Sequence, residues 1–241
     1  MNEKLNTITV VKTIILIPLF FSFLAMCCVV IVFCTIIPYG SYIATKVYEL
    51  FGYVGLKVVG IKINMTGEEY IDVNQSYVVV SNHPSTLDIF THIHTFPISV
   101  RFLTKSELYK IPIFGSTLKA LGLPRVDRNN AGKKEINRSV EEVVRKKNSI
   151  MVFAEGTRSN SDTSILPFKK GGAWLAINYN LPVLPVATTN GAKLMPRGKI
   201  WLRRGEIDIH IFKPIETSEM TIDNVQELTK ELENLIRSRI Q

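Results

Sequence analysis

The sequence predicts an α/β fold, organised as a single domain with a mixed, largely parallel sheet flanked by helices and preceded by two N-terminal helices. Short apolar runs alternate with helical patterns along most of the chain, which is typical of α/β proteins. Several of these runs are apolar at nearly every position, as in strands buried on both faces. With 241 residues the chain is long enough for one large domain. We expect the N-terminal helices over residues 1–60 and the folded body over residues 61–241.

The first predicted element is a membrane helix. Residues 13–45 contain no formally charged side chain, and a helix over residues 14–37 would be about 36 Å long at ~1.5 Å per residue, against a hydrocarbon core of ~30 Å. A cleaved signal peptide has an apolar region of only ~7–15 residues that ends at a small-residue cleavage site, and that site is absent here. The sequence leaves open whether the helix spans the bilayer or re-enters it.

A second, amphipathic helix is predicted after the helix-breaking sequence Pro38-Tyr39-Gly40. Within residues 41–62, apolar side chains recur at helical spacing and the charged ones fall elsewhere. The apolar positions are Ile43, Val47, Leu50, Phe51 and Val54. This helix fits either the core of the body or the headgroup layer of a membrane. Its place beside the membrane helix favours the membrane interface, so we interpret residues 1–60 as a membrane anchor.

The body contains the strands and helices of the predicted sheet. The expected strands are residues 76–81, 100–104, 149–154, 181–187 and 206–212, with a short one within 122–128. The expected helices are one that begins near Pro84 and residues 106–122, 131–147, 168–180 and 222–240. The last long strand alternates apolar and polar residues, whereas the others are nearly continuously apolar, so most of the sheet should be buried on both faces.

Charge and cysteine content limit the partners and cofactors. Lys and Arg number 29 against 21 Asp and Glu, which gives a net charge of +8. Glu3, Lys4 and Lys12 contribute +1 of this, which leaves +7 for the rest. The body should therefore favour anionic surfaces; we expect a membrane partner and no nucleic acid. All three cysteines lie in the apolar N-terminal run, so the body has no disulfide, thiolate metal site or cysteine nucleophile.

The basic residues that follow the apolar run indicate the orientation of the body. These are Lys46, Lys57 and Lys62. Because positively charged segments flanking a membrane helix stay on the cytoplasmic side, we expect the body on the cytoplasmic face.

The first candidate site is the segment Ser81-Asn82-His83-Pro84-Ser85-Thr86-Leu87-Asp88, which follows an apolar strand. His83 should lie at the carboxyl end of that strand, where open α/β sheets bind ligands. Asp88, five residues on, can point back to the imidazole, fix its tautomer and stabilise the imidazolium. Such a pair would act as a general base that activates a hydroxyl. Taken alone, the same spacing also fits a capped helix start with a surface carboxylate.

The second candidate site is Glu155-Gly156-Thr157-Arg158, at the end of another buried strand. Gly156 allows a tight, positive-φ turn that brings the backbone close to a ligand, and the planar guanidinium of Arg158 suits phosphate. The segment therefore fits an anion-binding loop, although an ordinary turn with a solvated arginine has the same pattern.

Further cations lie near other strand ends. Lys105 ends the strand at 100–104 and could bind phosphate or polarise a thioester carbonyl, or simply be solvated. Arg125 and Arg128 follow the short strand and fit either a surface ion-pair cluster or the same phosphate site.

Other chemistries lack their central residues. The chain has no G-x-S-x-G, P-loop or G-x-G-x-x-G sequence, which disfavours serine hydrolases, nucleoside triphosphatases and dinucleotide-binding enzymes. His92 and His94 would point about 200° apart on a helix at ~100° per residue, so they do not predict a metal site.

Taken in order, residues 82–88 (NHPSTLD), 122–128 (GLPRVDR), 153–159 (FAEGTRS) and 181–187 (LPVLPVA) resemble the four sequence blocks of the glycerolipid acyltransferase family. The resemblance is greatest to the 1-acylglycerol-3-phosphate (lysophosphatidate) acyltransferases. It covers roughly residues 40–214. The second block departs from the family at Pro124-Arg125-Val126.

The resemblance implies an O-acyltransferase that moves a fatty acyl group from acyl-CoA or acyl carrier protein to the sn-2 hydroxyl of lysophosphatidate, giving phosphatidate. No cofactor, metal or covalent intermediate is implied. His83 would be the general base and Asp88 its orienting partner. The residues implied to bind the acceptor are Glu155, Gly156, Thr157 and Arg158, with Arg125, Arg128 and Lys105. Two alternatives stay open: the same chemistry on another acceptor, such as glycerol-3-phosphate or another lysolipid, and a catalytically silent membrane lipid-binding protein.

Overall fold

The computed structural model describes residues 7–126, 133–159, 161–196 and 203–240. Its strands are β1 (Ile61–Thr66), β2 (Val78–Ser81), β3 (Val100–Phe102), β4 (Thr104–Lys105), β5 (Arg125–Val126), β6 (Ser149–Phe153), β7 (Val183–Thr189) and β8 (Gly205–Ile211). Its α-helices are α1 (Thr7–Phe33), α2 (Gly40–Val59), α3 (Leu87–Thr95), α4 (Phe114–Ala120), α5 (Lys133–Arg145), α6 (Gly171–Asn178), α7 (Gly191–Leu194) and α8 (Val225–Ile240). Single 3₁₀ turns cover Cys34–Ile36, Glu68–Tyr70, Ser106–Lys110 and Ile222–Asn224.

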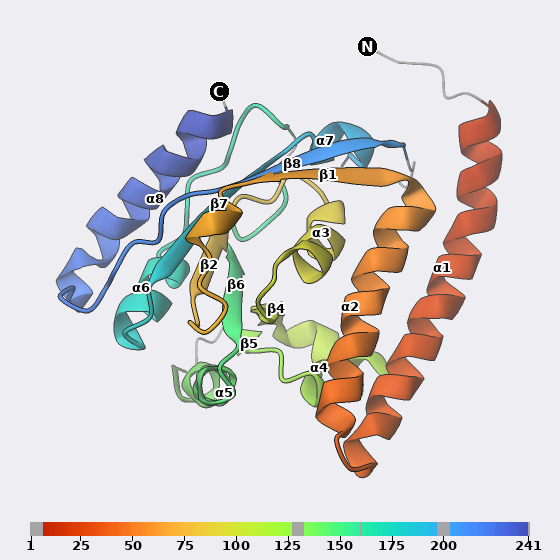
Figure 1. Ribbon diagram of the computed structural model, residues 1–241, viewed down its shortest axis with the longest axis horizontal. Helices are drawn as coiled ribbons and strands as arrows, with labels where there is room; N and C mark the ends of the chain where they lie inside the picture. The colour runs from red at the N-terminus through yellow and green to blue at the C-terminus, as the bar shows by residue number, and fades with distance from the viewer. Residues whose placement is uncertain (1–6, 127–132, 160, 197–202, 241) are drawn as a thin grey trace.

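Six strands form one sheet in the order β1-β8-β7-β2-β6-β3, and β4 and β5 form a separate two-stranded ribbon. Within the large sheet every neighbouring pair is parallel except β7 and β8. Helices lie on both faces (Figure 1): α2, α3 and α4 on one, and α5, α6 and α8 on the other. The predicted α/β fold with a mixed, largely parallel sheet is confirmed.

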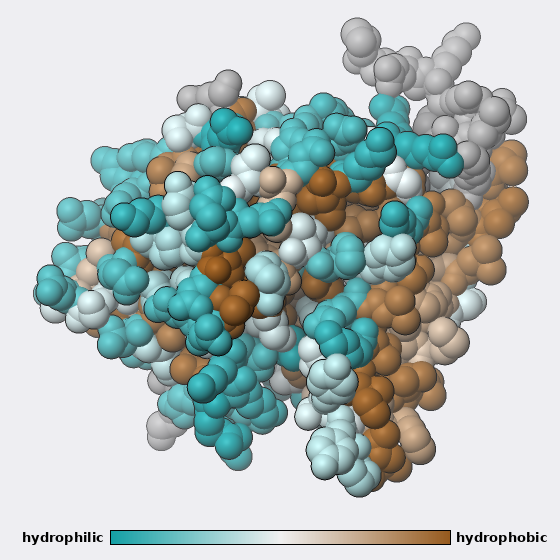
Figure 2. Space-filling model, in the orientation of Figure 1, coloured by the Kyte–Doolittle hydropathy of each residue, from teal (hydrophilic) through white to brown (hydrophobic). Residues whose placement is uncertain are grey.

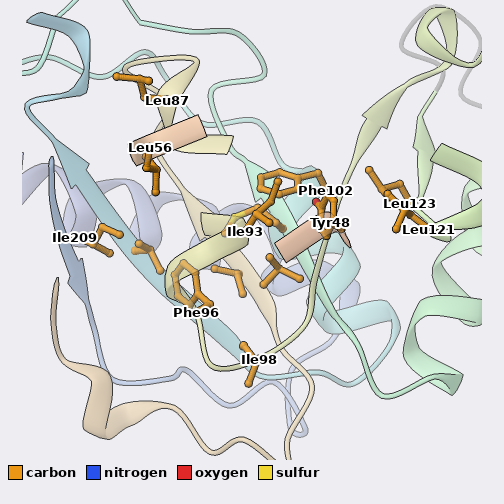
Figure 3. Packing of buried hydrophobic residues seen from close by; sticks show 14 of the residues in the cluster. Tyr48, Leu56, Leu87, Ile93, Phe96, Ile98, Phe102, Leu121, Leu123 and Ile209 are labelled. Carbon is orange, nitrogen blue, oxygen red and sulfur yellow. The ribbon is translucent and has the colours of Figure 1, made fainter. Parts of the chain in front are cut away.

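The sheet separates two hydrophobic cores. Along β2, Val79 enters the core under α2 and α3, while Val78 and Val80 enter the core under α6 and α8. This alternation explains why the strand is apolar at each of these positions. Figure 3 shows Leu56 of α2, Ile93 of α3 and Ile209 of β8 together in the first core.

The N-terminal helix leaves much of its apolar surface uncovered. Residues Thr13–Ile36 are long and apolar enough to cross a membrane, by length and composition. Side chains along this helix, including Ile14, Leu19 and Phe21, are more than half exposed, and Figure 2 shows apolar surface concentrated over α1 and the adjoining part of α2. Such surface suits lipid contact, which supports attachment of this end of the chain to a membrane.

The amphipathic helix α2 packs on the body through small residues, which the apolar spacing did not predict. Its glycines Gly52 and Gly55 face Ile93 and Phe90 of α3, so closely that an added Cβ would lie 2.8 Å and 2.6 Å from their side chains. The expected apolar stripe is divided: Phe51 contacts Phe20 of α1 and Phe90 of α3, with 5.6 Å and 5.3 Å between ring centroids, whereas Ile43 and Leu50 are exposed. Close approach of two helices requires small residues, so the buried face includes the two glycines beside part of the stripe.

Several elements differ from the sequence prediction: β1 and α7 were not expected, and three helix boundaries have a clear local cause. Gly60, at φ +80°, ends α2, and residues 61 and 62, expected in the helix, begin the edge strand β1. Pro112 divides the expected helix 106–122 into a 3₁₀ turn and α4. The helix expected near Pro84 begins only at Leu87. The division at residue 60 and the anchor function of residues 1–60 stay predictions.

Candidate active site

The pairing of β2 with β6 brings the two polar segments together. Ser81 lies opposite Phe153 in the parallel register, and both strands end there. Two residues farther along each chain segment come His83 and Glu155. Because parallel strands present their carboxyl ends at the same edge, both segments leave the sheet side by side.

The backbone of His83 is clamped by the second segment. Its N–H donates to Oε1 of Glu155 at 2.7 Å, and its carbonyl accepts the N–H of Ser159 at 2.9 Å. The other oxygen of Glu155, Oε2, accepts the N–H of Leu166 at 2.8 Å. Burial raises the pKa of the Glu155 carboxyl, and the two backbone hydrogen bonds oppose that rise. Both carboxylate oxygens of Glu155 thus bind backbone.

The imidazole of His83 is hydrogen-bonded to Asp88. Nδ1 of His83 lies 2.8 Å from Oδ2 of Asp88, which also accepts the N–H of Ser85 at 2.8 Å. Burial raises the pKa of the Asp88 carboxyl, opposed by the hydrogen bond and charge of His83. The His83 side chain is 12% exposed and that of Asp88 is 0% exposed. With Nδ1 engaged, Nε2 is the nitrogen that can take a proton from a substrate.

The path from His83 to Asp88 is a turn rather than helix. We expected Asp88 about one and a half helical turns inside a helix that starts at Pro84; instead it lies in the first turn of α3, which begins at Leu87. The Ser85 hydroxyl accepts the N–H of Leu87 at 3.3 Å. This side chain replaces the missing helical turn before α3.

Phe153, the last residue of β6, fixes the plane of the His83 ring. The two rings are stacked, with 3.8 Å between centroids and 7° between planes. Phe102 and His92 lie around Phe153, at ring-centroid distances of 5.6 Å and 5.8 Å. Sequence reasoning placed Phe153 in a strand and at the start of the third family block, but it gave this residue no role of its own.

Asn82 ties the first segment to β7, a role that the sequence analysis did not assign. Its Nδ2 donates to the carbonyl of Thr188 at 2.8 Å, and its Oδ1 accepts the N–H of Thr188 at 2.8 Å. Asn82 is buried. A side-chain amide can imitate a strand pairing in this way, so the segment after β2 stays attached to the sheet.

Gly156 adopts the positive φ expected of it, +69°. An added Cβ there would lie 3.0 Å from Cδ and Cε of Lys169, so this lysine runs along the glycine. Thr157 is exposed and Arg158 is half-buried. Nη1 of Arg158 donates to Oγ1 of Thr86, which places the guanidinium beside the segment that carries His83.

The remaining predicted cations lie on the β4–β5 ribbon or outside the described residues. Lys105 and Arg125 lie on the two paired strands, where Lys105 is opposite Val126 and Arg125 is opposite Thr104. The Arg125 guanidinium lies over the ring of Tyr109, 5.8 Å from its centroid. In the part of the chain that the structure describes, neither of these two cations forms a hydrogen bond or ion pair with His83 or Asp88. Arg128 lies outside the described residues.

Comparisons with known proteins agree with the resemblance of the sequence blocks. The family model described as acyltransferase matches residues 62–189. The chain is 30% identical over 204 residues to a 1-acyl-sn-glycerol-3-phosphate acyltransferase of Saccharomyces cerevisiae, covering 83% of this chain and 67% of that protein. A protein of the same name from Limnanthes alba is 29% identical, covering 86% of this chain and 78% of that protein.

A solved structure is similar along nearly the whole chain. The crystal structure of the 1-acyl-sn-glycerophosphate (LPA) acyltransferase of Thermotoga maritima matches with a TM-score of 0.74 and 25% identity, covering 94% of each chain. The family match spans more than half of the chain and includes both polar segments. The chain therefore belongs to the acyltransferase family and is an O-acyltransferase.

Proposed function

We propose that the protein transfers a fatty acyl group from an acyl thioester to the sn-2 hydroxyl of lysophosphatidate, giving phosphatidate, a step of phospholipid biosynthesis. The observation that carries the proposal is the His83–Asp88 pair, joined at 2.8 Å with the imidazole reachable from solvent and the carboxylate buried. The names of the relatives from Saccharomyces cerevisiae and Limnanthes alba support lysophosphatidate as the acceptor.

In the proposed reaction, Nε2 of His83 takes the proton of the acceptor hydroxyl. At the same time, the hydroxyl oxygen attacks the thioester carbonyl carbon. The new ester C–O bond forms and the C–S bond breaks, and the thiolate leaves with the proton from the imidazolium. Asp88 stabilises the imidazolium between these steps, because a buried carboxylate interacts strongly with an adjacent positive charge. The mechanism needs no metal, cofactor or covalent enzyme intermediate; acyl-CoA or acyl carrier protein is the co-substrate.

The loop after Glu155 is proposed to bind the acceptor's phosphate. Gly156 brings the backbone close, and the Arg158 guanidinium provides a planar pair of donors next to His83. Arg–phosphate hydrogen bonds are among the stronger ones in proteins. The further residues proposed for substrate contact are Thr157, Lys105, Arg125 and Arg128.

Glu155 is proposed to act through His83 in addition to any role in acceptor binding. Its two carboxylate oxygens bind the backbone of His83 and Leu166. A carboxylate used in this way holds the general base in place. We therefore assign Glu155 to positioning.

The membrane end of the chain is proposed to keep the enzyme at its substrate. Lysophosphatidate and phosphatidate reside in the bilayer, and the apolar helix of residues Thr13–Ile36 would hold the domain against it. We propose that the body lies on the cytoplasmic face, as the basic residues after this helix suggest.

The test is acyl transfer by detergent-extracted protein, with lysophosphatidate, glycerol-3-phosphate and lysophosphatidylcholine as acceptors and acyl-CoA or acyl carrier protein as donors. His83→Ala should lower kcat by ~10²–10⁴-fold, the usual contribution of a positioned base. His94 is an exposed histidine of α3, and His94→Ala should keep wild-type turnover.

Each outcome has a distinct meaning. Phosphatidate from the wild type and not from His83→Ala supports the proposal. If product forms only from another acceptor, that acceptor is the substrate and the proposed mechanism stands. If no acceptor gives product, the protein is a silent lipid binder, and if His83→Ala retains most turnover, the general-base role is wrong.

A further inference from the structure

The short helix α7 lies directly against the carboxylate of Asp88. After β7, Asn190 adopts φ +69° and turns the chain into α7, whose first residue is Gly191. An added Cβ at Gly191 would lie 2.9 Å from Cβ of Ser85 and 3.1 Å from Oδ1 of Asp88. Non-bonded carbon atoms pack at ~3.5–4.0 Å. Any larger residue at 191 would therefore displace the segment that carries the His83–Asp88 pair.

Hydrogen bonds hold α7 in this position at both ends. The Asp162 carboxylate accepts the N–H of Ala192 at 2.8 Å and the N–H of Lys193 at 3.0 Å. At the other end, the Ser85 hydroxyl donates to the carbonyl of Met195 at 3.1 Å. The helix cannot move away from Asp88 without breaking these bonds, so the position of Gly191 beside Asp88 is fixed.

Gly191 faces Oδ1 of Asp88, the carboxylate oxygen that accepts no hydrogen bond within the described residues. Oδ2 binds His83 and Ser85, whereas Oδ1 is buried and forms no hydrogen bond within the described residues. The terminal torsion of aspartate is soft. The space beside Oδ1 is limited, so a side chain at position 191 would push the carboxylate and turn Oδ2 out of line with Nδ1 of His83.

We propose that Gly191, held in place by Asp162, is a positioning residue that sets the orientation of Asp88 for catalysis. The inference rests on the proposed general-base role of His83. It gives Asp162 a part in the reaction, although its carboxylate binds only the backbone of α7.

The experiment compares two glycines that each begin a helix. Gly191→Ala places its methyl group against Asp88, whereas Gly171→Ala, at the start of α6, meets no atom within 4 Å. Because misplacing reacting groups by ~1 Å can slow a reaction by about 10²-fold, Gly191→Ala should lower kcat about 10- to 100-fold and leave the acceptor KM within about two-fold. Gly171→Ala should behave as wild type.

A second pair of variants addresses the support of α7 without adding atoms near Asp88. Both also remove the Asp162 charge, which raises the pKa of the Asp88 carboxyl, so Asp162→Ala and Asp162→Asn are compared with each other at equal charge. Asp162→Ala removes both acceptors and should also lower kcat at unchanged KM, while Asp162→Asn keeps one oxygen and should recover part of the loss. If Gly191→Ala does not fold, these variants test the positioning role by themselves.

The ¹⁵N spectrum of the imidazoles gives a readout that loss of stability alone would not change. The chain has four histidines, and the signals of His83 are identified by their loss in His83→Ala. In Gly191→Ala, these signals should leave the tautomer that carries its proton on Nδ1, because the acceptor for that proton has turned away.

Two results would overturn the inference. If His83→Ala abolishes turnover while Gly191→Ala and Asp162→Ala match Gly171→Ala, the positioning role is wrong and the general base stands. If the Asp162 variants lose activity only through a higher KM, Asp162 and α7 serve substrate binding instead. Full turnover by His83→Ala would reject the proposed general-base role on which the inference rests.

Discussion

His83 is restrained by three groups from two segments of the chain. Asp88 holds Nδ1, Phe153 lies against one face, and the Glu155 segment fixes the backbone. A general base must lie within hydrogen-bond distance of the substrate proton. Each restraint therefore raises the fraction of conformations in which the ring can react.

Arg158→Ala should mainly weaken acceptor binding. Loss of a charge-assisted hydrogen bond to the acceptor phosphate should raise the free energy of binding by about 1.5–3 kcal/mol, seen as a higher KM for lysophosphatidate. Arg145→Ala removes the same charge from the exposed side of α5 and serves as the control. An unchanged KM in Arg158→Ala would remove this residue from the phosphate site.

His92 makes the free energy of unfolding of the protein depend on pH. Burial lowers its pKa to about 3 from the ordinary 6.5, with the charge of His83 contributing. Between these two values the unfolded chain binds a proton that the folded one does not, so stability is lost as the pH falls. From about pH 8 to about pH 5 this group should lower the free energy of unfolding by about 2 kcal/mol.

The check is urea unfolding of detergent-solubilised protein at the two pH values. His92→Leu, close in volume, should lose about 2 kcal/mol less than wild type over that range. Equal losses in both proteins would show that His92 is not the group responsible.

At the scale of elements, the contact between α2 and α3 depends on glycine. Gly52→Val would force a branched side chain against Ile93, where an added Cβ already lies 2.8 Å from Cγ2. Overpacking of this kind should lower the free energy of unfolding by about 1–3 kcal/mol. Leu50→Val, exposed on the same helix, should change it by no more than about 0.5 kcal/mol. The two denaturation midpoints measure the difference, and equal midpoints would mean that the helices separate freely.

The register of two strands decides which polar segments form the site. His83 and Glu155 are 72 residues apart in sequence, and they meet because Ser81 lies opposite Phe153. A shift by one residue would turn every side chain of β2 to the other face. The buried valines of this strand, which enter two different cores, prevent that shift.

For the whole molecule, the apolar N-terminal helix and the net charge of +8 provide two different means of membrane attachment. Salt screens charges over a Debye length of ~3 Å at 1 M, but it does not remove an inserted helix. The full-length protein should therefore stay in the membrane pellet at high salt. A chain that lacks residues 1–40 should be released, as measured by sedimentation and immunoblotting.

The contrary result is as informative. Full-length protein that high salt extracts would be held by its basic surface, and the exposed apolar face of α1 would then need another explanation.

Most strands and helices of the body, the apolar helix and the two polar segments at strand ends follow from the sequence by itself, whereas β1 and α7 do not. Each is a local property: continuous apolar runs indicate buried strands, and a positive-φ glycine such as Gly156 is expected where a strand turns into a ligand loop. The resemblance of the four blocks added the roles of His83 and Asp88, since their spacing alone also fits a capped helix start.

Only the tertiary structure decided which residues meet. The binding of Glu155 to the His83 backbone, the stacking of Phe153 on the imidazole and the contact of Gly191 with Asp88 join segments about 70–110 residues apart. The buried face of α2 likewise follows from how closely α3 approaches. These contacts depend on strand order, register and the distance between packed elements, and the periodicity of a single segment contains no information about its distant neighbours.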